Sequence, residues 1–152
     1  MSYSFNLKLT DHTDDIKKLT EEGIETLLEA IGQEAEGDVV LKISDPTWKP
    51  KEPIDTGVLK NSITHRVVVS GAKVSEHAVY VGTNVAYAPY VEFGTGDQGT
   101  HSGPAWTYRD DEGKFHRTSG MKARPFLRRG ISENVKKYKE IAEDSLEQTF
   151  GD

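Results

Sequence analysis

Apolar residues recur at intervals of three and four along residues 12–43, which predicts an amphipathic helix with one buried stripe. Thr13 is a candidate N-cap, and Asp14 and Asp15 follow it in the first turn, where the helix dipole favours negative charge. The end of this element stays open, because the β-branched run 39–43 would also suit a strand. The stripe consists of Ile16, Leu19, Gly23, Ile24, Leu27, Leu28 and Ile31.

Two runs rich in β-branched and aromatic residues, 62–69 and 76–82, follow further along the chain. A short segment with Gly71 separates them, so we expect an antiparallel strand pair over residues 62–82. His65 and His77 lie in these runs. Two histidines do not complete a metal site, which also needs carboxylate or cysteine ligands. We therefore expect solvent-facing histidines here and no metal.

The segment 54–63 contains Asp55-Thr56-Gly57, a tripeptide that also occurs in aspartic proteases. Those enzymes need a second carboxylate that shares a proton with the first, and this chain has no second Asp-Thr-Gly, so only a homodimer would supply it. The favoured interpretation is that Asp55 or Thr56 caps a short helical turn that holds Val58 and Leu59.

The segment 81–96 places three aromatic rings among glycines and a proline. Its one carboxylate is Glu92, and it has no histidine, cysteine or lysine, so it offers no nucleophile and base pair. The glycines permit backbone angles that other residues resist, and Pro89 fixes one angle, so the segment is predicted to form a structured turn. We expect the rings of Tyr87, Tyr90 and Phe93 to lie in the core or to lock this turn.

The sequence of residues 97–120 predicts a β-hairpin that projects from the domain as an arm. The runs 106–109 and 114–117 flank a turn with Gly113, and polar, glycine-rich segments lie on both sides. A two-stranded arm cannot bury both of its faces within its own fold. We therefore predict that Trp106, Tyr108 and Phe115 are partner-interface residues.

A second amphipathic helix is predicted over residues 126–149, and Pro125 precedes it. Together these elements predict one α+β domain over residues 1–152, in which a small antiparallel β-sheet packs against the long N-terminal helix and the C-terminal helix, with the β-hairpin projecting. The apolar face of the second helix consists of Leu127, Ile131, Val135, Tyr138, Ile141 and Leu146.

Composition excludes several classes of function. The chain has no cysteine, its histidines are scattered, and it has neither a nucleophile elbow nor a phosphate loop, so we expect no enzyme, cofactor or metal site. No apolar run is long enough to span a bilayer, and we expect no membrane contact or secretion. The formal net charge of −6 opposes non-specific attraction to DNA. The alternative of a nucleic-acid-binding protein rests on the basic segment 122–129.

Three segments in order, 54–63, 81–95 and 123–128, resemble the gene-product-ten-like family of bacteriophage neck and tail-completion proteins, known from Hong Kong-type lambdoid phages. The resemblance covers about residues 12–148, and Lys60 stands where members often have arginine. The motif residues are Asp55, Gly57, Tyr87, Pro89, Tyr90, Glu92, Phe93, Gly94, Pro125 and Phe126.

The resemblance implies a structural virion protein of a long-tailed phage or prophage that acts in tail completion or head–tail joining. It implies a ring of roughly six copies, placed in the neck or the head-proximal tail and assembled in the host bacterial cytoplasm. Partners would be further copies of the chain and tail-tube, tail-terminator or head-connector proteins, and DNA would pass through the lumen without sequence-specific binding. From its charge rather than from the resemblance, we expect the acidic chain to give a lumen that repels the DNA. The expected partner interface consists of Trp106, Tyr108, Phe115, Arg124, Arg128 and Arg129.

Overall fold

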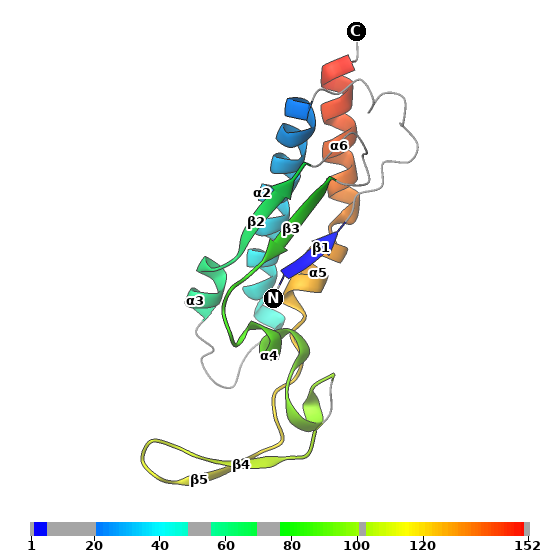
Figure 1. The fold of residues 1–152 in the computed structure, drawn as a ribbon. Helices are drawn as coiled ribbons and strands as arrows, with labels where there is room; N and C mark the ends of the chain where they lie inside the picture. The colour runs from blue at the N-terminus through cyan, green and yellow to red at the C-terminus, as the bar shows by residue number, and fades with distance from the viewer. Residues whose placement is uncertain (1, 6–20, 49–55, 70–76, 101–102, 151–152) are drawn as a thin grey trace.

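A long helix, a small sheet and a separate hairpin make up an α+β fold, as predicted (Figure 1). The computed structural model describes residues 2–5, 21–48, 56–69, 77–100 and 103–150. In chain order its elements are β1 (Ser2–Phe5), α2 (Glu21–Ile43), the 3-10 helix η1 (Pro46–Trp48), α3 (Thr56–Asn61), β2 (Thr64–Val68), β3 (Ala78–Gly82), α4 (Ala88–Phe93), the 3-10 helix η3 (Gly96–Gln98), β4 (Trp106–Arg109), β5 (Phe115–Thr118), α5 (Phe126–Ser132) and α6 (Val135–Phe150).

The sheet has three antiparallel strands in the order β1-β3-β2. Strand β3 is central, with Tyr80 opposite Ser4 of β1 and opposite Arg66 of β2. The predicted pairing of 62–69 with 76–82 is confirmed by β2 and β3, whereas β1 was not predicted. Val79 and Val81 alternate along β3 and are both buried, so one face of the central strand belongs to the core.

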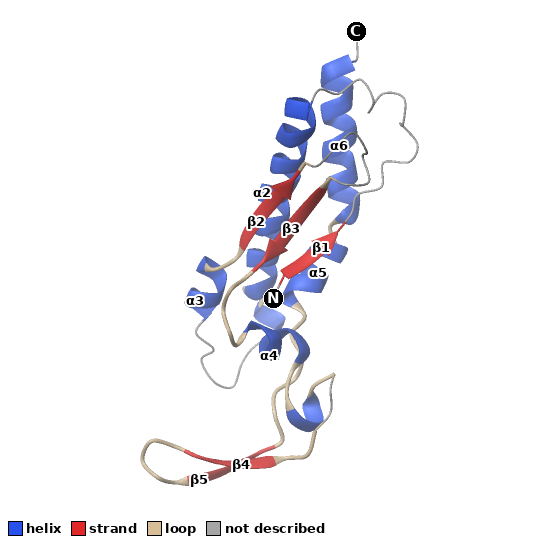
Figure 2. Cartoon of the chain, viewed as in Figure 1, coloured by secondary structure: helices blue, strands red, loops and turns tan. Residues whose placement is uncertain are grey.

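Helix α2 lies at the centre of the body, because it contacts β2 and β3 as well as α5 and α6. Figure 2 shows α2 and α6 running side by side behind the sheet. Leu27, Ile31, Ala35 and Val39 recur every fourth residue, and all four are buried. The helix continues through Ile43, which settles the open choice for residues 39–43 in favour of helix. The predicted part over 12–20, including the expected N-cap, lies outside the described residues.

The predicted helix over 126–149 is divided into α5 and α6. Asn134 follows the end of α5, and its side-chain amide donates a hydrogen bond of 2.8 Å to the carbonyl oxygen of Gly130. Gly130 is buried, and a Cβ atom there would lie 2.9 Å from the Cα atom of Val39. The break therefore occurs next to the place where the backbone of α5 approaches α2 most tightly.

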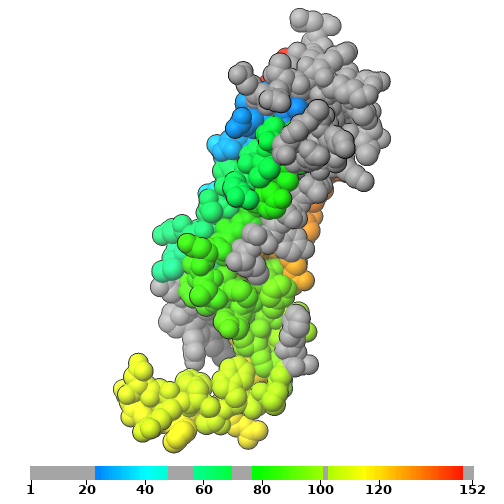
Figure 3. Space-filling model, in the orientation of Figure 1, coloured from blue at the N-terminus to red at the C-terminus, as the bar shows by residue number. Residues whose placement is uncertain are grey.

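Strands β4 and β5 form a separate two-stranded antiparallel sheet, which confirms the predicted hairpin. The space-filling view shows it as a thin projection from the body (Figure 3). It lies at the end of the molecule where α2 ends, far from the first turns of that helix (Figure 1). Within the described ranges, every helix is too short or too polar to traverse a lipid bilayer.

Candidate functional site: the hairpin arm and its root

The hairpin of β4 and β5 and its turn are called the arm below, and the segments 91–96 and 119–128 that lead into and out of it are called the arm root. The root contains one buried carboxylate, Glu92 on α4, whose side chain is only 1% exposed. It accepts hydrogen bonds from the backbone N–H groups of Leu127, at 2.8 Å, and Arg128, at 3.1 Å, and from Nε of Arg128, at 3.0 Å. Because first-turn N–H groups lack partners within a helix, Glu92 satisfies the start of α5 and ties it to α4.

Backbone hydrogen bonds close the root. The N–H of Thr95 donates to the carbonyl of Met121 at 2.9 Å, and the N–H of Met121 donates back to the carbonyl of Thr95 at 3.1 Å. One step further out, the N–H of Asp97 donates to the carbonyl of Ser119 at 2.8 Å. The two segments are therefore held together before the arm begins.

Two glycines make this close crossing possible. Gly94 has a φ of +73°, and Gly120 has a φ of +98°, both in the region that glycine tolerates best. A Cβ atom at Gly120 would collide with the carbonyl oxygen of Thr95, and one at Gly94 would lie 2.5 Å from the carbonyl oxygen of Met121. Larger residues would force the two segments apart.

The arm has two different faces, because side chains alternate along each strand. Trp106 and Tyr108 lie on one face, together with His116, which is directly opposite Tyr108. The rings of Tyr108 and His116 stack with their centroids 5.4 Å apart. Nε2 of His116 lies 2.6 Å from Oδ2 of Asp110, and this hydrogen bond is the main reason that the pKa of Asp110 is lowered.

The opposite face carries Phe115 between two arginines. Arg109 is directly opposite Phe115, and its guanidinium lies 5.7 Å from the centroid of that ring. Arg117 is two residues along β5 and is exposed. The three aromatic residues predicted at an interface are all exposed, at 42% for Trp106, 49% for Tyr108 and 71% for Phe115. The sequence did not reveal that Phe115 faces away from the other two.

The three arginines predicted at the interface lie near the root. Arg128 pairs with Glu92 and places its guanidinium 5.1 Å from the centroid of the Phe93 ring. Arg129 pairs at 2.6 Å with Glu133, the C-cap residue of α5. Arg124 is half-buried. Two of these arginines thus already hold carboxylates of their own chain, and their contact with a neighbour stays a prediction.

Within the segment 81–96, which was predicted as a structured turn, residues 83–87 form a turn that leads into the short helix α4. Pro89 lies in its first turn, and Tyr87 at its N-cap packs against the core. The expectation of a buried or turn-locking ring is wrong for Tyr90, which is 60% exposed. The reason is helical periodicity, since the turn of α4 that buries Val91 and Glu92 directs Tyr90 outward.

The remaining motif residues have structural positions. Pro125 is the N-cap residue of α5, and Phe126 behind it is fully buried. Gly57 lies in α3, the short helix expected around Val58 and Leu59. Asp55, considered from the sequence as either a helix cap or a catalytic carboxylate, lies outside the described residues.

His65 does not face solvent as expected. Its side chain is 13% exposed, and its ring lies between two glutamates of α2, with Nδ1 2.6 Å from Glu36 and Nε2 2.8 Å from Glu29. Burial lowers the pKa of His65, but the hydrogen bonds and charges of Glu36 and Glu29 outweigh it, so the pKa is raised. Gly32 makes room for the ring, because a Cβ atom there would collide with it. The carboxylates come from a helix about thirty residues away, so strand patterning alone could not reveal them.

A second polar cluster joins α2 to α6. The hydroxyl of buried Tyr138 donates to Oδ2 of Asp38 at 2.8 Å, and the ammonium of Lys137 contacts Oδ1 of Asp38 and lies 2.9 Å from Glu34. Burial and the neighbouring carboxylate raise the pKa of Tyr138. From the sequence, Tyr138 was predicted on the apolar face of the second helix, and its partner Asp38 was not predicted. A buried tyrosine hydroxyl needs a hydrogen-bond partner, and this requirement could have indicated that a polar residue lies opposite Tyr138.

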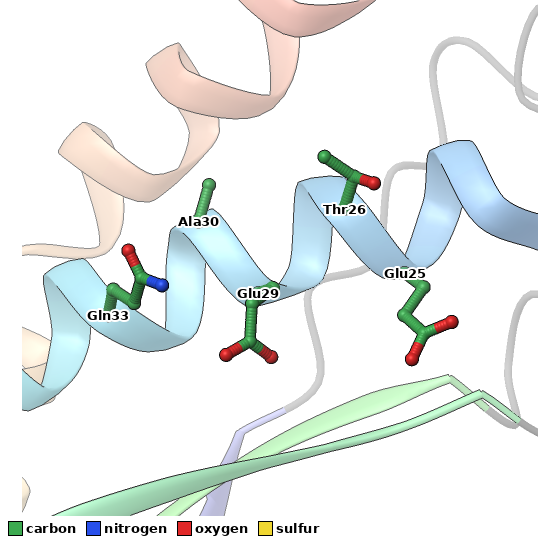
Figure 4. A pocket seen from close by; sticks show the side chains of 5 residues that line it. All are labelled: Glu25, Thr26, Glu29, Ala30 and Gln33. Atoms are coloured by element: carbon green, nitrogen blue, oxygen red, sulfur yellow. The ribbon is translucent and has the colours of Figure 1, made fainter.

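Helix α2 also bears a shallow open hollow of about 550 Å³, lined by Glu25, Thr26, Glu29, Ala30 and Gln33. Figure 4 shows these side chains along successive turns of the helix. Glu25 and Glu29 point to the same side of α2, away from Thr26 and Ala30 (Figure 4). Among the residues that the structure describes, no group of three or more histidine, aspartate or glutamate side chains is arranged to hold a metal ion.

The chain was compared with known protein families, curated proteins and solved structures. A family model described as "Bacteriophage HK97-gp10, putative tail-component" matches residues 8–94, which is more than half of the 152 residues. The matched range includes the first motif and all but the last residue of the second, and it ends at Gly94 in the arm root. The third motif, 123–128, lies beyond it. No curated protein and no solved structure matches the chain.

Proposed function

Because the chain belongs to the HK97-gp10-like family of phage tail components, we propose that it acts in tail completion or head–tail joining of a long-tailed phage or prophage. The family is described as a putative tail component, which supports a structural rather than an enzymatic role for the chain. The observation that carries the finer proposal is the arm, which exposes aromatic side chains on a root fixed by buried Glu92. A rigidly rooted, exposed aromatic arm is suited to grip a neighbouring protein.

The proposed working form is a ring of roughly six copies. The arm and the body offer different surfaces, so a contact between the arm of one copy and the body of the next is heterologous. Such contacts propagate from copy to copy and close when the rotation returns to the first subunit. In this proposal the whole chain acts as a single domain, with the arm as its extension towards a neighbour.

The ring is proposed to sit in the neck or the head-proximal tail, against tail-tube, tail-terminator or head-connector proteins. The net charge of −6 favours a lumen that lets DNA slide through without being held. We do not propose nucleic-acid binding for the basic segment 122–129, because Arg128 and Arg129 are already paired with carboxylates of the chain. A gel shift with increasing salt tests that alternative.

The test is deletion of the gene from its phage, followed by electron microscopy of the lysate. We expect filled heads and tails that have not joined, and complementation by the intact chain restores infectious particles. A chain in which residues 104–118 are replaced by a short Gly-Ser linker tests the arm, and its failure to complement, despite normal folding, supports the proposal. Complete, infectious particles formed without the protein would refute it.

A further inference from the structure

Charge is distributed unevenly along this chain. Residues 106–129, which include the arm, contain seven basic and three acidic side chains and so carry a formal charge of +4. The rest of the chain contains 12 basic and 22 acidic side chains and carries −10. The segment 106–129 and the rest of the chain therefore carry opposite net charge, although residues 106–118, the arm itself, contain three basic and three acidic side chains and have no net charge.

The arm separates its charges, with two arginines on the face around Phe115 and three acidic residues in its turn. Phe115 is 71% exposed, and Arg109 and Arg117 flank it on the same face. An exposed aromatic ring between arginines has the composition of an interface hot spot, because both residue types are enriched there. This face, defined by Arg109, Phe115 and Arg117, is called the cationic face below.

The hollow on α2 has the opposite character. Glu25 and Glu29 lie one helical turn apart, and Thr26 and Ala30 are small side chains on the adjacent positions (Figure 4). All four residues are exposed, and His65 holds the carboxylate of Glu29 in place at 2.8 Å. A flat ring can approach the side of α2 that carries Thr26 and Ala30, and long arginine side chains beside the ring can extend around the helix to donate to the carboxylates, which point to the other side.

The two surfaces also match in spacing. Side chains four residues apart on a helix have Cβ atoms about 5–6 Å apart. Diagonal neighbours across an antiparallel pair, such as Arg109 and Arg117, lie about 7–8 Å apart. Arginine side chains are long enough to cover the small difference and to pair with one carboxylate each.

We infer that the cationic face of the arm docks on the α2 hollow of a second copy of this chain. The hollow of the same chain is out of reach, because the arm lies at the opposite end of the molecule from the first turns of α2 (Figure 1). Arm and hollow are different surfaces, so the contact is heterologous and leads from one copy to the next. This inference rests on the proposed ring and names the contact that forms it.

Charge complementarity also decides between a protein and a nucleic acid as the occupant. Cationic and aromatic side chains together can grip a single strand of nucleic acid. The turn of the same arm, however, carries the consecutive acidic residues Asp110, Asp111 and Glu112. With these three acidic residues the arm has no net positive charge, which non-specific binding to nucleic acid needs, whereas two separate carboxylates on α2 require only the two arginines of the cationic face.

The test is a charge exchange, measured by sedimentation equilibrium of the full-length chain across a concentration series. Arg117→Glu and Glu25→Arg each place like charges in the contact, and we expect each to weaken self-association about 10-fold or more. The double variant restores the pair in reversed order, and its association should return to within about threefold of wild type. Lys139→Glu on α6 changes the net charge as Arg117→Glu does and serves as the matched control, with unchanged association. Circular dichroism checks that each variant is folded.

Three results would overturn the inference. One is association that Arg117→Glu and Glu25→Arg leave unchanged, or that the double variant does not restore. Another is a wild-type chain that stays monomeric at concentrations approaching about 1 mM. The third is a Phe115→Ser variant that loses affinity for a short single-stranded DNA while it self-associates normally. None of these would decide whether phage particles need the protein, so the proposed function is tested separately.

Discussion

The buried carboxylate of Glu92 gives the sharpest test of how the arm is fixed. In Glu92→Gln the side chain keeps its size but loses its charge and one of its two acceptor oxygens. Oε2 accepts from the N–H of Leu127, and Oε1 accepts from the N–H and Nε of Arg128. The amide NH₂ group must therefore face at least one donor that it cannot satisfy.

The expected cost follows from these contacts. A buried backbone N–H group left without a partner costs about 1–3 kcal/mol. The guanidinium of Arg128 adds little, because its side chain is 38% exposed and can turn to water. We therefore expect Glu92→Gln to lower the free energy of unfolding by about 2 kcal/mol, and Tm by about 4–8 °C for a chain of this length.

Urea unfolding followed by circular dichroism at pH 7 measures this change, and amide hydrogen exchange at Thr95 and Met121 reports on the root directly. Glu133→Gln is the matched control, since Glu133 also pairs with an arginine but is 41% exposed. The control should unfold close to the wild-type midpoint. Equal midpoints for Glu92→Gln and Glu133→Gln, with no faster exchange at the root, would refute this account of Glu92.

Further predictions concern other parts of the chain. Gly120→Ala should destabilise the protein by about 1–3 kcal/mol in thermal unfolding, because alanine is strained at a φ of +98°. The control Gly103→Ala, whose new methyl group has nothing within 4 Å, should change the stability by no more than about 0.5 kcal/mol in the same assay. Tyr138→Phe removes the hydroxyl from buried Asp38 and should cost about 1 kcal/mol in urea unfolding, since Lys137 remains as a partner; no loss would contradict the hydrogen bond. The raised pKa of His65 means that its stabilisation is complete below its ordinary value of 6.5 and is lost as the pH rises through the folded-state pKa. The advantage of wild type over His65→Gln in urea midpoint should therefore shrink between pH 5.5 and 8.5, and a constant difference would contradict the ion-pair geometry.

Local patterns predicted the elements whose partners lie nearby in sequence. The period of α2 and the pairing of β2 with β3 and of β4 with β5 were visible, because each depends on residue types at short spacing. The alternation in Ser2-Tyr3-Ser4-Phe5 is the signal that would have revealed β1. Four residues alone are too few to separate a strand from a loop.

What the sequence did not reveal depends on distant partners. His65 was expected in solvent because its glutamates come from another element, and Glu92 gave no sign that it would reach the start of α5. Nor could the sequence reveal that Gly130, near the division between α5 and α6, meets Val39, because the two segments lie about ninety residues apart. The placement of Phe115 and Trp106 on opposite faces required only the strand register, which the turn of the hairpin sets.

The closed root makes the arm exchangeable. Thr95 and Met121 bond to each other through backbone groups alone, so the ends of the intervening segment are held together without help from their side chains. Lengthening such a segment costs only about 0.6 kcal/mol for each doubling of its length. An arm of another length or sequence could thus be grafted at the same two residues while the body folds unchanged, which offers a route to redirect the chain towards a different partner.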